Sequence, residues 1–137
     1  MRHTALAVLF ISCGILAGQS KTEIKKIPIK QTSPASGKEM FVEYCASCHG
    51  KEGKGDGPAA VALKTPPSNL ATLAARNKGT FPALGVAQAI QGDGSNFAHG
   101  SRDMPIWGQV FHTHETNSTV KLRIANLTDY IQSLQTK

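Results

Sequence analysis

The sequence predicts an all-α fold, and three observations lead to this prediction. Two segments, residues 37–48 and 120–134, place apolar side chains at the three- and four-residue spacing of a helix. No segment shows a convincing strand pattern with a neighbouring strand to pair with. The chain has 137 residues, of which 40% are hydrophobic, and this suits one small domain with a modest core.

The first predicted helix, residues 37–48, has a recognisable start. Ser36 is a suitable N-cap, and Glu39 follows three residues later, as in a capping box. The large apolar and aromatic side chains that follow lie at helical spacing: Met40, Phe41 and Tyr44. The helix therefore carries a Cys-x-x-Cys-His sequence, residues 45–49, at its end.

This Cys-x-x-Cys-His sequence is typical of covalent haem attachment. One helical turn separates Cys45 from Cys48, so both thiols face the same side and can add to the two vinyl groups of a haem. His49 follows directly, and its imidazole can bind the iron from that side. The sequence therefore predicts one covalently attached haem c, with His49 as an iron ligand.

Three other roles are conceivable for the two cysteines. A structural zinc site needs four ligands, and the chain has no second Cys-x-x-Cys. A thioredoxin-like redox pair needs a βαβ setting, which the helical pattern does not offer. A disulfide between Cys45 and Cys48 in a secreted protein remains open.

The second axial ligand of the iron is expected from the later half of the chain. Met104 is the preferred candidate, because Pro105 stiffens the chain directly after it and helps to hold a weak thioether ligand. A lone Met usually fills a core, but the charged and turn-forming residues around Met104 indicate a loop. Three histidines are the other candidates: His99, His112 and His114.

Three further helices are expected in the rest of the chain. Asn69 could cap a helix that runs to Asn77, with Gly79 as its stop. Residues Pro82 to Gln91 form another, which Gly92 ends. The last helix runs from Val120 to Leu134, with one apolar stripe: Ile124, Leu127, Ile131 and Leu134.

Residues 1–18 are predicted to be a signal peptide. A positive start with Arg2 precedes an uncharged apolar run from Ala5 to Ala17. Two cleavage sites remain open. A lipobox-like sequence ends at Cys13, which would become a lipidated first residue, and the alternative is ordinary cleavage just after the apolar run. In both cases the mature protein is expected outside the cytoplasm, in the periplasm or anchored to the membrane.

Residues 19–36 predict a flexible tether, because they contain four lysines, two prolines and several Ser and Thr residues without a helical period. Residues 37–137 are then the folded domain. The formal net charge of +6 could suggest nucleic-acid binding, but five of the fifteen basic residues precede residue 37. The domain itself has ten basic and eight acidic residues. Because it lacks the positive charge that dominates nucleic-acid affinity, no nucleic-acid partner is expected.

Taken together, these residues resemble class I c-type cytochromes, in particular a bacterial monohaem subgroup. The resemblance covers about residues 36–135 and is carried by the haem motif, by Gly37-x-x-x-Phe41 before it, and by Met104-Pro105 after it. Two longer stretches, residues 48–60 and 99–108, are similar to the monohaem subgroup.

The resemblance implies an all-α, cytochrome c-like domain wrapped around one covalent haem. It implies that Gly37 and Phe41 pack the first helix across the last, against Tyr130. It also implies that a proline carbonyl accepts a hydrogen bond from the His49 imidazole. The candidates for this proline are Pro67 or Pro66, with Pro58 as their rival. Trp107 is expected near a haem propionate or in the core.

With His49 and Met104 both on the iron, no open position remains for a substrate. We therefore expect an electron-transfer protein and not an enzyme: a periplasmic or membrane-tethered single-electron carrier, a monomer, that serves redox proteins such as a membrane oxidase or dehydrogenase. The alternative is the cytochrome c subunit of a larger respiratory oxidoreductase complex. A haem enzyme or gas sensor is a third reading, and it requires that Met104 does not bind the iron.

Overall fold

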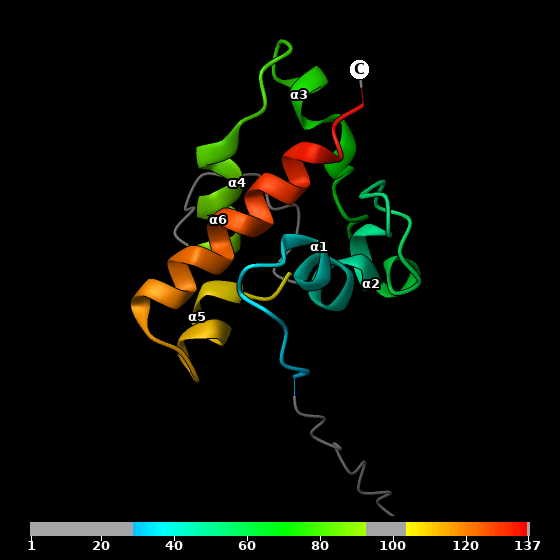
Figure 1. The fold of residues 1–137 in the computed structure, drawn as a ribbon. Helices are drawn as coiled ribbons and strands as arrows, with labels where there is room; N and C mark the ends of the chain where they lie inside the picture. Colours follow the sequence, from blue (N-terminus) through cyan, green and yellow to red (C-terminus); the bar gives the residue numbers. More distant parts are fainter. Residues whose placement is uncertain (1–28, 93–103, 137) are drawn as a thin grey trace, which may run out of the picture.

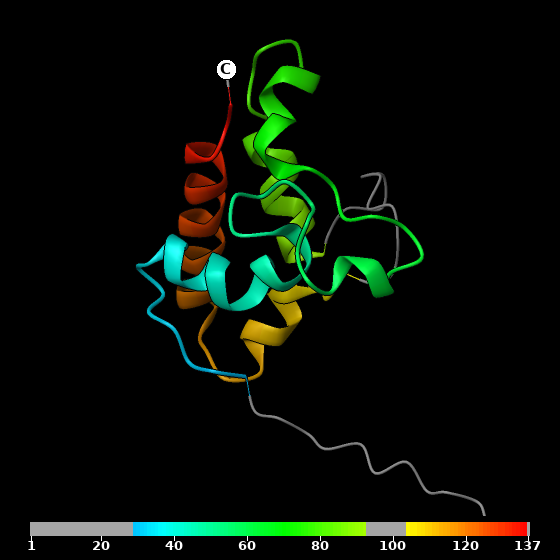
Figure 2. The same ribbon diagram turned by 90° about the vertical axis from the view of Figure 1, so that its right-hand side faces the viewer.

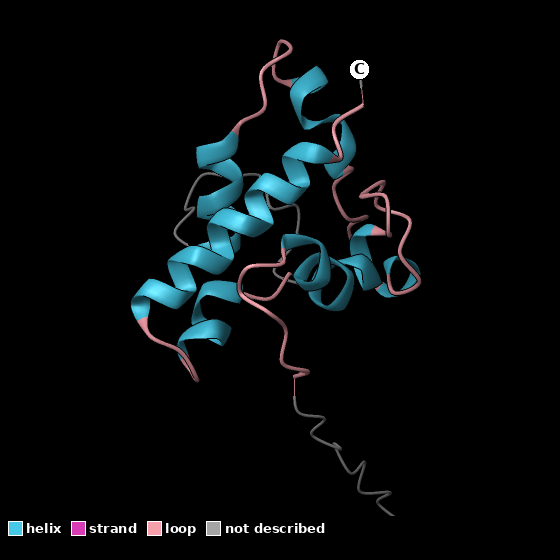
Figure 3. Ribbon diagram, viewed as in Figure 1, coloured by secondary structure: helices cyan, strands magenta, loops and turns pink. Residues whose placement is uncertain are grey.

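A computed structural model of the chain describes residues 29–92 and 104–136. These residues form short helices and loops, with no β-strand among them (Figure 3). In chain order the helices are α1 (Gly37–Met40), a π-helical turn η1 (Phe41–Cys45), α2 (Ala46–His49), two 3₁₀ turns η2 (Ala60–Ala62) and η3 (Leu70–Thr72), α3 (Leu73–Arg76), α4 (Ala83–Gln91), α5 (Trp107–His112) and α6 (Asn117–Ser133). The predicted all-α fold is confirmed. No helix in this part of the chain is long and apolar enough to cross a membrane.

The first predicted helix is present as a continuous helical segment of α1, η1 and α2. Ser36 caps it, since its hydroxyl accepts a hydrogen bond from the Glu39 amide at 3.2 Å. The Glu39 carboxylate accepts from the amide of Ser33 at 3.2 Å, so the second bond of the cap goes three residues further back than a capping box places it. The π-helical turn, which was not predicted, widens the helix over the residues that lead to Cys45.

This helical segment lies across α6 (Figures 1 and 2). Gly37 comes so close to α6 that a Cβ atom at this position would collide with the carbonyl oxygen of Asn126. The rings of Phe41 and Tyr130 pack together, with centroids 5.3 Å apart and planes tilted by 54°. The crossing that the resemblance implied is therefore present, and glycine is required there because the two backbones meet.

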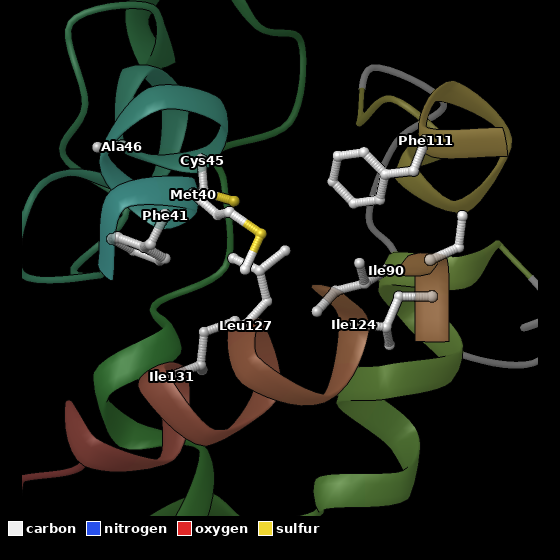
Figure 4. Packing of buried hydrophobic residues seen from close by; sticks show 10 residues of the cluster. Met40, Phe41, Cys45, Ala46, Ile90, Phe111, Ile124, Leu127 and Ile131 are labelled. Atoms are coloured by element: carbon white, nitrogen blue, oxygen red, sulfur yellow. The ribbon is translucent and has the colours of Figure 1, made fainter. Parts of the chain in front are cut away.

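The core lies between this segment, α4, α5 and α6 (Figure 4). The predicted stripe of α6 is buried at Ile124, Leu127 and Ile131, and Leu134 packs against it just beyond the helix. The other elements supply the remaining large buried side chains: Met40 and Phe41, Ile90 from α4 and Phe111 from α5.

The described end of the predicted tether, residues 29–36, packs against the helices. Thr32 is buried, and Arg123 of α6 donates to its hydroxyl at 2.9 Å and to its carbonyl oxygen at 2.8 Å. The same guanidinium binds the Glu115 carboxylate with N–O distances of 2.6 and 2.5 Å. The stretch around Thr32 therefore belongs to the folded unit. The predicted signal peptide and the rest of the tether lie outside the described residues.

Both helices predicted in the middle of the chain are present. The Asn69 side chain accepts from the Ala71 amide at 3.0 Å and starts η3 and α3. Gly92 ends α4 in the left-handed conformation, with φ of 91°. By contrast, α5 was not predicted, because the region after Pro105 resembles a loop in sequence. This short helix is held by its buried side chain Phe111.

Candidate functional site

A cavity between α2, α3, α4 and α6 brings Cys45, His49 and Met104 together. Its volume is ≈ 230 Å³, somewhat below the range of about 300–1,000 Å³ that is usual for ligand sites. Ser68 and Arg76 are its other polar lining residues. Most of the remaining wall is apolar: Leu70, Leu73, Val86, Ala89, Ile90 and Ile131. Such a wall fits a large apolar ring system that presents a few polar groups.

The two cysteines lie one helical turn apart, and only Cys45 lines the cavity. Cys45 is buried and faces the cavity, while Cys48, one helical turn later, is half-buried and does not itself line it. Both thiols are free, so the alternative disulfide is not formed. Burial, with a smaller contribution from the charge of Cys48, raises the pKa of Cys45 to about 12. A thioredoxin-like pair needs a lowered thiol pKa, and this environment gives the opposite.

The His49 imidazole is oriented by the backbone. Its Nδ1 lies 3.0 Å from the carbonyl oxygen of Ser68. A carbonyl can only accept, so Nδ1 carries the proton and Nε2 keeps the lone pair that a metal needs. Such an outer contact fixes the ring and increases the basicity of the ligand.

The carbonyl that orients His49 does not belong to a proline, so the expectation for Pro66, Pro67 or Pro58 is wrong. The acceptor is the next residue after Pro67. The Pro67 carbonyl itself lies over Gly55, where a Cβ atom would come within 2.5 Å of that oxygen. Gly55 also has φ of 84°, which favours glycine. The turn at Pro67 thus sends its own carbonyl to the glycine-rich loop and presents Ser68 to the histidine.

The glycine-rich loop after His49 completes the backbone hydrogen bonds around the site. The amide of Gly55 donates to the His49 carbonyl at 2.7 Å, and that of Gly57 donates to the Cys48 carbonyl at 3.1 Å. These bonds satisfy carbonyls at the end of α2 that lack helical partners. The Gly53 carbonyl accepts from the Leu70 amide at 2.6 Å. The loop therefore joins the end of the haem motif to the segment that follows Ser68.

Among the four methionine and histidine candidates for the second axial position, Met104 is placed at the cavity. His112 and His114 are exposed and do not line it. His99 lies outside the described residues. The structure therefore brings Cys45, His49 and Met104 together, and it keeps the two described rival histidines away from them.

Trp107 occupies an aromatic cluster and does not line the cavity. Its ring stacks on that of Tyr44, with centroids 5.1 Å apart, and lies 5.9 Å from that of Phe111. Of the two expectations for this residue, these contacts favour packing in the core.

Two polar residues at the cavity, Ser68 and Arg76, were not predicted. Ser68 acts through its backbone carbonyl, so its residue type does not indicate this role. The two prolines before it show only that the backbone is restricted there. Arg76 lies in the last turn of α3, and its guanidinium donates to the Asn69 carbonyl at 2.5 Å. A cation at the end of a short helix has an ordinary role in satisfying carbonyls, which is why the sequence did not distinguish it.

The described residues contain no group of three His, Cys, Asp or Glu side chains placed to hold a metal ion, so the zinc alternative finds no ligand set in them.

The sequence of residues 32–121 matches the protein family described as cytochrome c oxidase, cbb3-type, subunit III. This span contains the haem motif and Met104. A search of curated proteins and a search of solved structures gave no match to this sequence. The chain therefore belongs to this family: it is a c-type cytochrome domain that carries covalently attached haem c.

Proposed function

We propose that this protein is a single-electron carrier that works outside the cytoplasm, with His49 and Met104 as the two axial ligands of its haem iron. The observation that carries the proposal is their position in one cavity together with Cys45. A haem c bound there supplies a one-electron redox centre. The protein's part is to hold that centre, close it to other ligands and set its potential.

The described residues include side chains suited to each of these three tasks. Cys45 and Cys48 hold the group covalently. Ser68 keeps the proton of His49 on Nδ1, so Nε2 is available to the metal. Met104 offers a thioether, which favours the reduced state relative to a second histidine.

Closure of both axial positions is the reason to propose electron transfer and not catalysis. A substrate or gas would first have to displace Met104 from the iron. Arg76 adds the one basic side chain among the described residues that line the cavity. We assign it to a carboxylate of the bound group, since a guanidinium pairs well with carboxylates.

A Met104→Ala variant tests this assignment. Thioether ligation of ferric haem gives a weak absorption band near the red end of the visible spectrum, and we expect it in the wild type. The variant should lose the band, bind carbon monoxide readily in the reduced form and have a lower reduction potential. Matched His112→Ala and His114→Ala variants should keep the band. A wild type that binds carbon monoxide readily would favour the haem enzyme or sensor.

The covalent attachment has its own test. Haem should remain with the wild-type protein after acid–acetone extraction and denaturing electrophoresis, and Cys45→Ala or Cys48→Ala should weaken its retention. If wild-type haem is released on denaturation, attachment through the two thiols is wrong.

The family description favours a second function, the cytochrome c subunit of a respiratory oxidase complex. Purification from membranes in mild detergent distinguishes the two. A carrier should separate from oxidase subunits, whereas a subunit should remain with them in constant proportion.

The same preparation tests the membrane anchor. A lipid on Cys13 predicts that Cys13→Ser moves the protein to the soluble fraction, and soluble wild-type protein would exclude it.

A further inference from the structure

The last residues of the chain fasten the end of α6 to one wall of the cavity. The Gln135 side chain accepts from the Ala74 amide at 2.8 Å and donates to the Leu70 carbonyl at 2.7 Å. It also donates to the Ile131 carbonyl, within α6, at 2.9 Å. The Thr136 amide donates to the Ala71 carbonyl at 2.9 Å. The contacts between the two segments therefore extend over η3 and the start of α3.

The segment that these bonds hold faces the cavity. Leu70, Leu73 and Arg76 all line it. The segment begins two residues after Ser68, whose carbonyl orients the His49 imidazole. A displacement of η3 and α3 would therefore move both the wall of the cavity and the hydrogen-bond partner of the proximal histidine.

This segment has little stability of its own. α3 has only four residues, and isolated helices shorter than about 12–15 residues are marginal in water. Its N-cap residue, Thr72, makes no side-chain capping bond. The Gln135 carboxamide satisfies the Ala74 amide, one of the first-turn donors that lack a helical partner. Gln135 therefore caps α3, although it lies 61 residues away from Ala74 in the sequence.

We propose that Gln135 is a positioning residue for the haem site, which holds η3 and α3 so that Ser68 stays on His49 and the cavity wall stays closed. The inference rests on the proposed role of His49 as an axial ligand. The hydrogen bond to Ser68 makes the imidazole a stronger donor to ferric iron, which stabilises the oxidised state. Loss of Gln135 weakens that bond, so the reduction potential rises, whereas loss of Met104 lowers it.

The test compares Gln135→Met with Gln132→Met in the haem-loaded protein. Methionine keeps the length of the side chain and removes the carboxamide bonds, and Gln132 is an exposed residue in the last turn of α6. For Gln135→Met we expect amide exchange at Ala74 and cyanide binding to the ferric protein to accelerate about tenfold, the factor for about 1.4 kcal/mol of lost hydrogen bonding. We also expect a higher potential. Gln132→Met should match the wild type in all three.

A merely structural role predicts a different result. If the free energy of unfolding falls in Gln135→Met while the potential and the rate of cyanide binding stay at wild-type values, the proposal is overturned. If this variant does not accumulate, Gln135→Glu takes its place, because it keeps an acceptor for Ala74 and loses the donor to Leu70. A change in potential and cyanide rate in the same direction supports the proposal, and wild-type values overturn it. Failure of the axial assignment itself would show separately, in the wild-type spectrum.

Discussion

Gly37 occupies the closest approach between α1 and α6, and its size decides whether the two helices can cross. Alanine is the better helix former by about 1 kcal/mol. At this position, however, its methyl group would meet the Asn126 carbonyl, which is held within α6 and cannot turn away. The geometry of the crossing therefore outweighs helix propensity.

We expect Gly37→Ala to lower the free energy of unfolding by about 1–3 kcal/mol, the usual cost of overpacking. Denaturant titration of the haem-loaded protein measures this. Lys38→Ala, at the next and exposed position, is the control and should change stability little. A Gly37→Ala protein as stable as the wild type would show that α1 can move away from α6 at low cost.

A second prediction at this scale concerns the Glu115 carboxyl. The hydrogen bond from Arg123 lowers its pKa, and the charges of Arg123 and His114 act in the same direction against the opposing effect of burial. A carboxyl with a lowered folded pKa contributes stability above its unfolded pKa, about 4.3. That contribution is lost as the pH falls through the folded pKa.

The free energy of unfolding should therefore decrease with falling pH below about 5, and this decrease should be smaller in Glu115→Gln. At pH 7 the variant should be less stable by about 1.5–3 kcal/mol, the usual value of hydrogen bonds to a charged group. Glu43→Gln is the control, because Glu43 pairs with an exposed Lys30 at 3.2 Å and surface pairs contribute little. Parallel pH profiles for the wild type and Glu115→Gln would contradict the prediction.

Sequence and structure agree at residues whose side-chain type is itself required. Gly37 is of this kind at the close approach to α6, and Cys45 and His49 are of the residue types that the proposed thioether bond and metal ligand need. Ser68 serves through its backbone carbonyl, which every residue has, and Thr32 combines such a carbonyl with a hydroxyl. Their roles depend on where the chain turns in three dimensions, and no sequence pattern records that.

At the scale of elements, long periodic segments were predictable and short ones were not. α6 has 17 residues and shows its apolar stripe in the sequence. α5 has six residues and follows a proline, and it is a helix because Phe111 and Trp107 join an aromatic cluster with Tyr44. Tertiary contacts therefore determine the elements that are too short to show a period.

The stretch around Thr32 gives a prediction at this scale, because the buried Arg123 guanidinium joins it to α6. Thr32→Val keeps the side-chain shape and removes the hydroxyl that Arg123 and Tyr44 bind at 2.9 and 2.8 Å. A buried donor left without its partner costs about 1–3 kcal/mol. We expect this loss in the free energy of unfolding, with faster exchange of amides in residues 30–36.

Thr80→Val is the matched control, because Thr80 is exposed in a loop. It should leave both measurements unchanged. If Thr32→Val behaves like this control, the contact with Arg123 adds nothing to stability, and the flexible tether effectively extends to residue 36 as the sequence predicted.

At the scale of the whole molecule, the haem is part of the core. The cavity has a volume of ≈ 230 Å³ and a mainly apolar wall, and the side chains around it cannot bury that surface against one another while the fold is kept. A group that binds only the folded state stabilises it by mass action, and a covalent group does so at every protein concentration.

A Cys45→Ala, Cys48→Ala double variant purified without haem should therefore be several kcal/mol less stable. In a domain of about 100 residues each kcal/mol lowers the melting temperature by about 4–8 °C. Circular dichroism at 222 nm, followed with temperature, should show a broad transition or none. His112→Ala, which leaves attachment intact, is the control and should melt as the wild type does. A sharp transition at the wild-type temperature in the haem-free protein would mean that the polypeptide forms this core alone.

The contact between Thr32 and Arg123 also determines where mechanical load enters the domain. Any pull transmitted through the residues before Ile29 meets this contact and, just ahead of it, the bond of 2.8 Å from the Tyr44 hydroxyl to the Lys30 carbonyl. Arg123 precedes the cavity residue Ile131 by eight positions on α6, about 12 Å along the helix axis. The other end of the described chain, with Gln135, lies at the opposite end of α6 (Figure 1). Such a pull would thus load Tyr44 of η1 and Arg123 of α6 before it reached the contacts of Gln135 at the far end of α6.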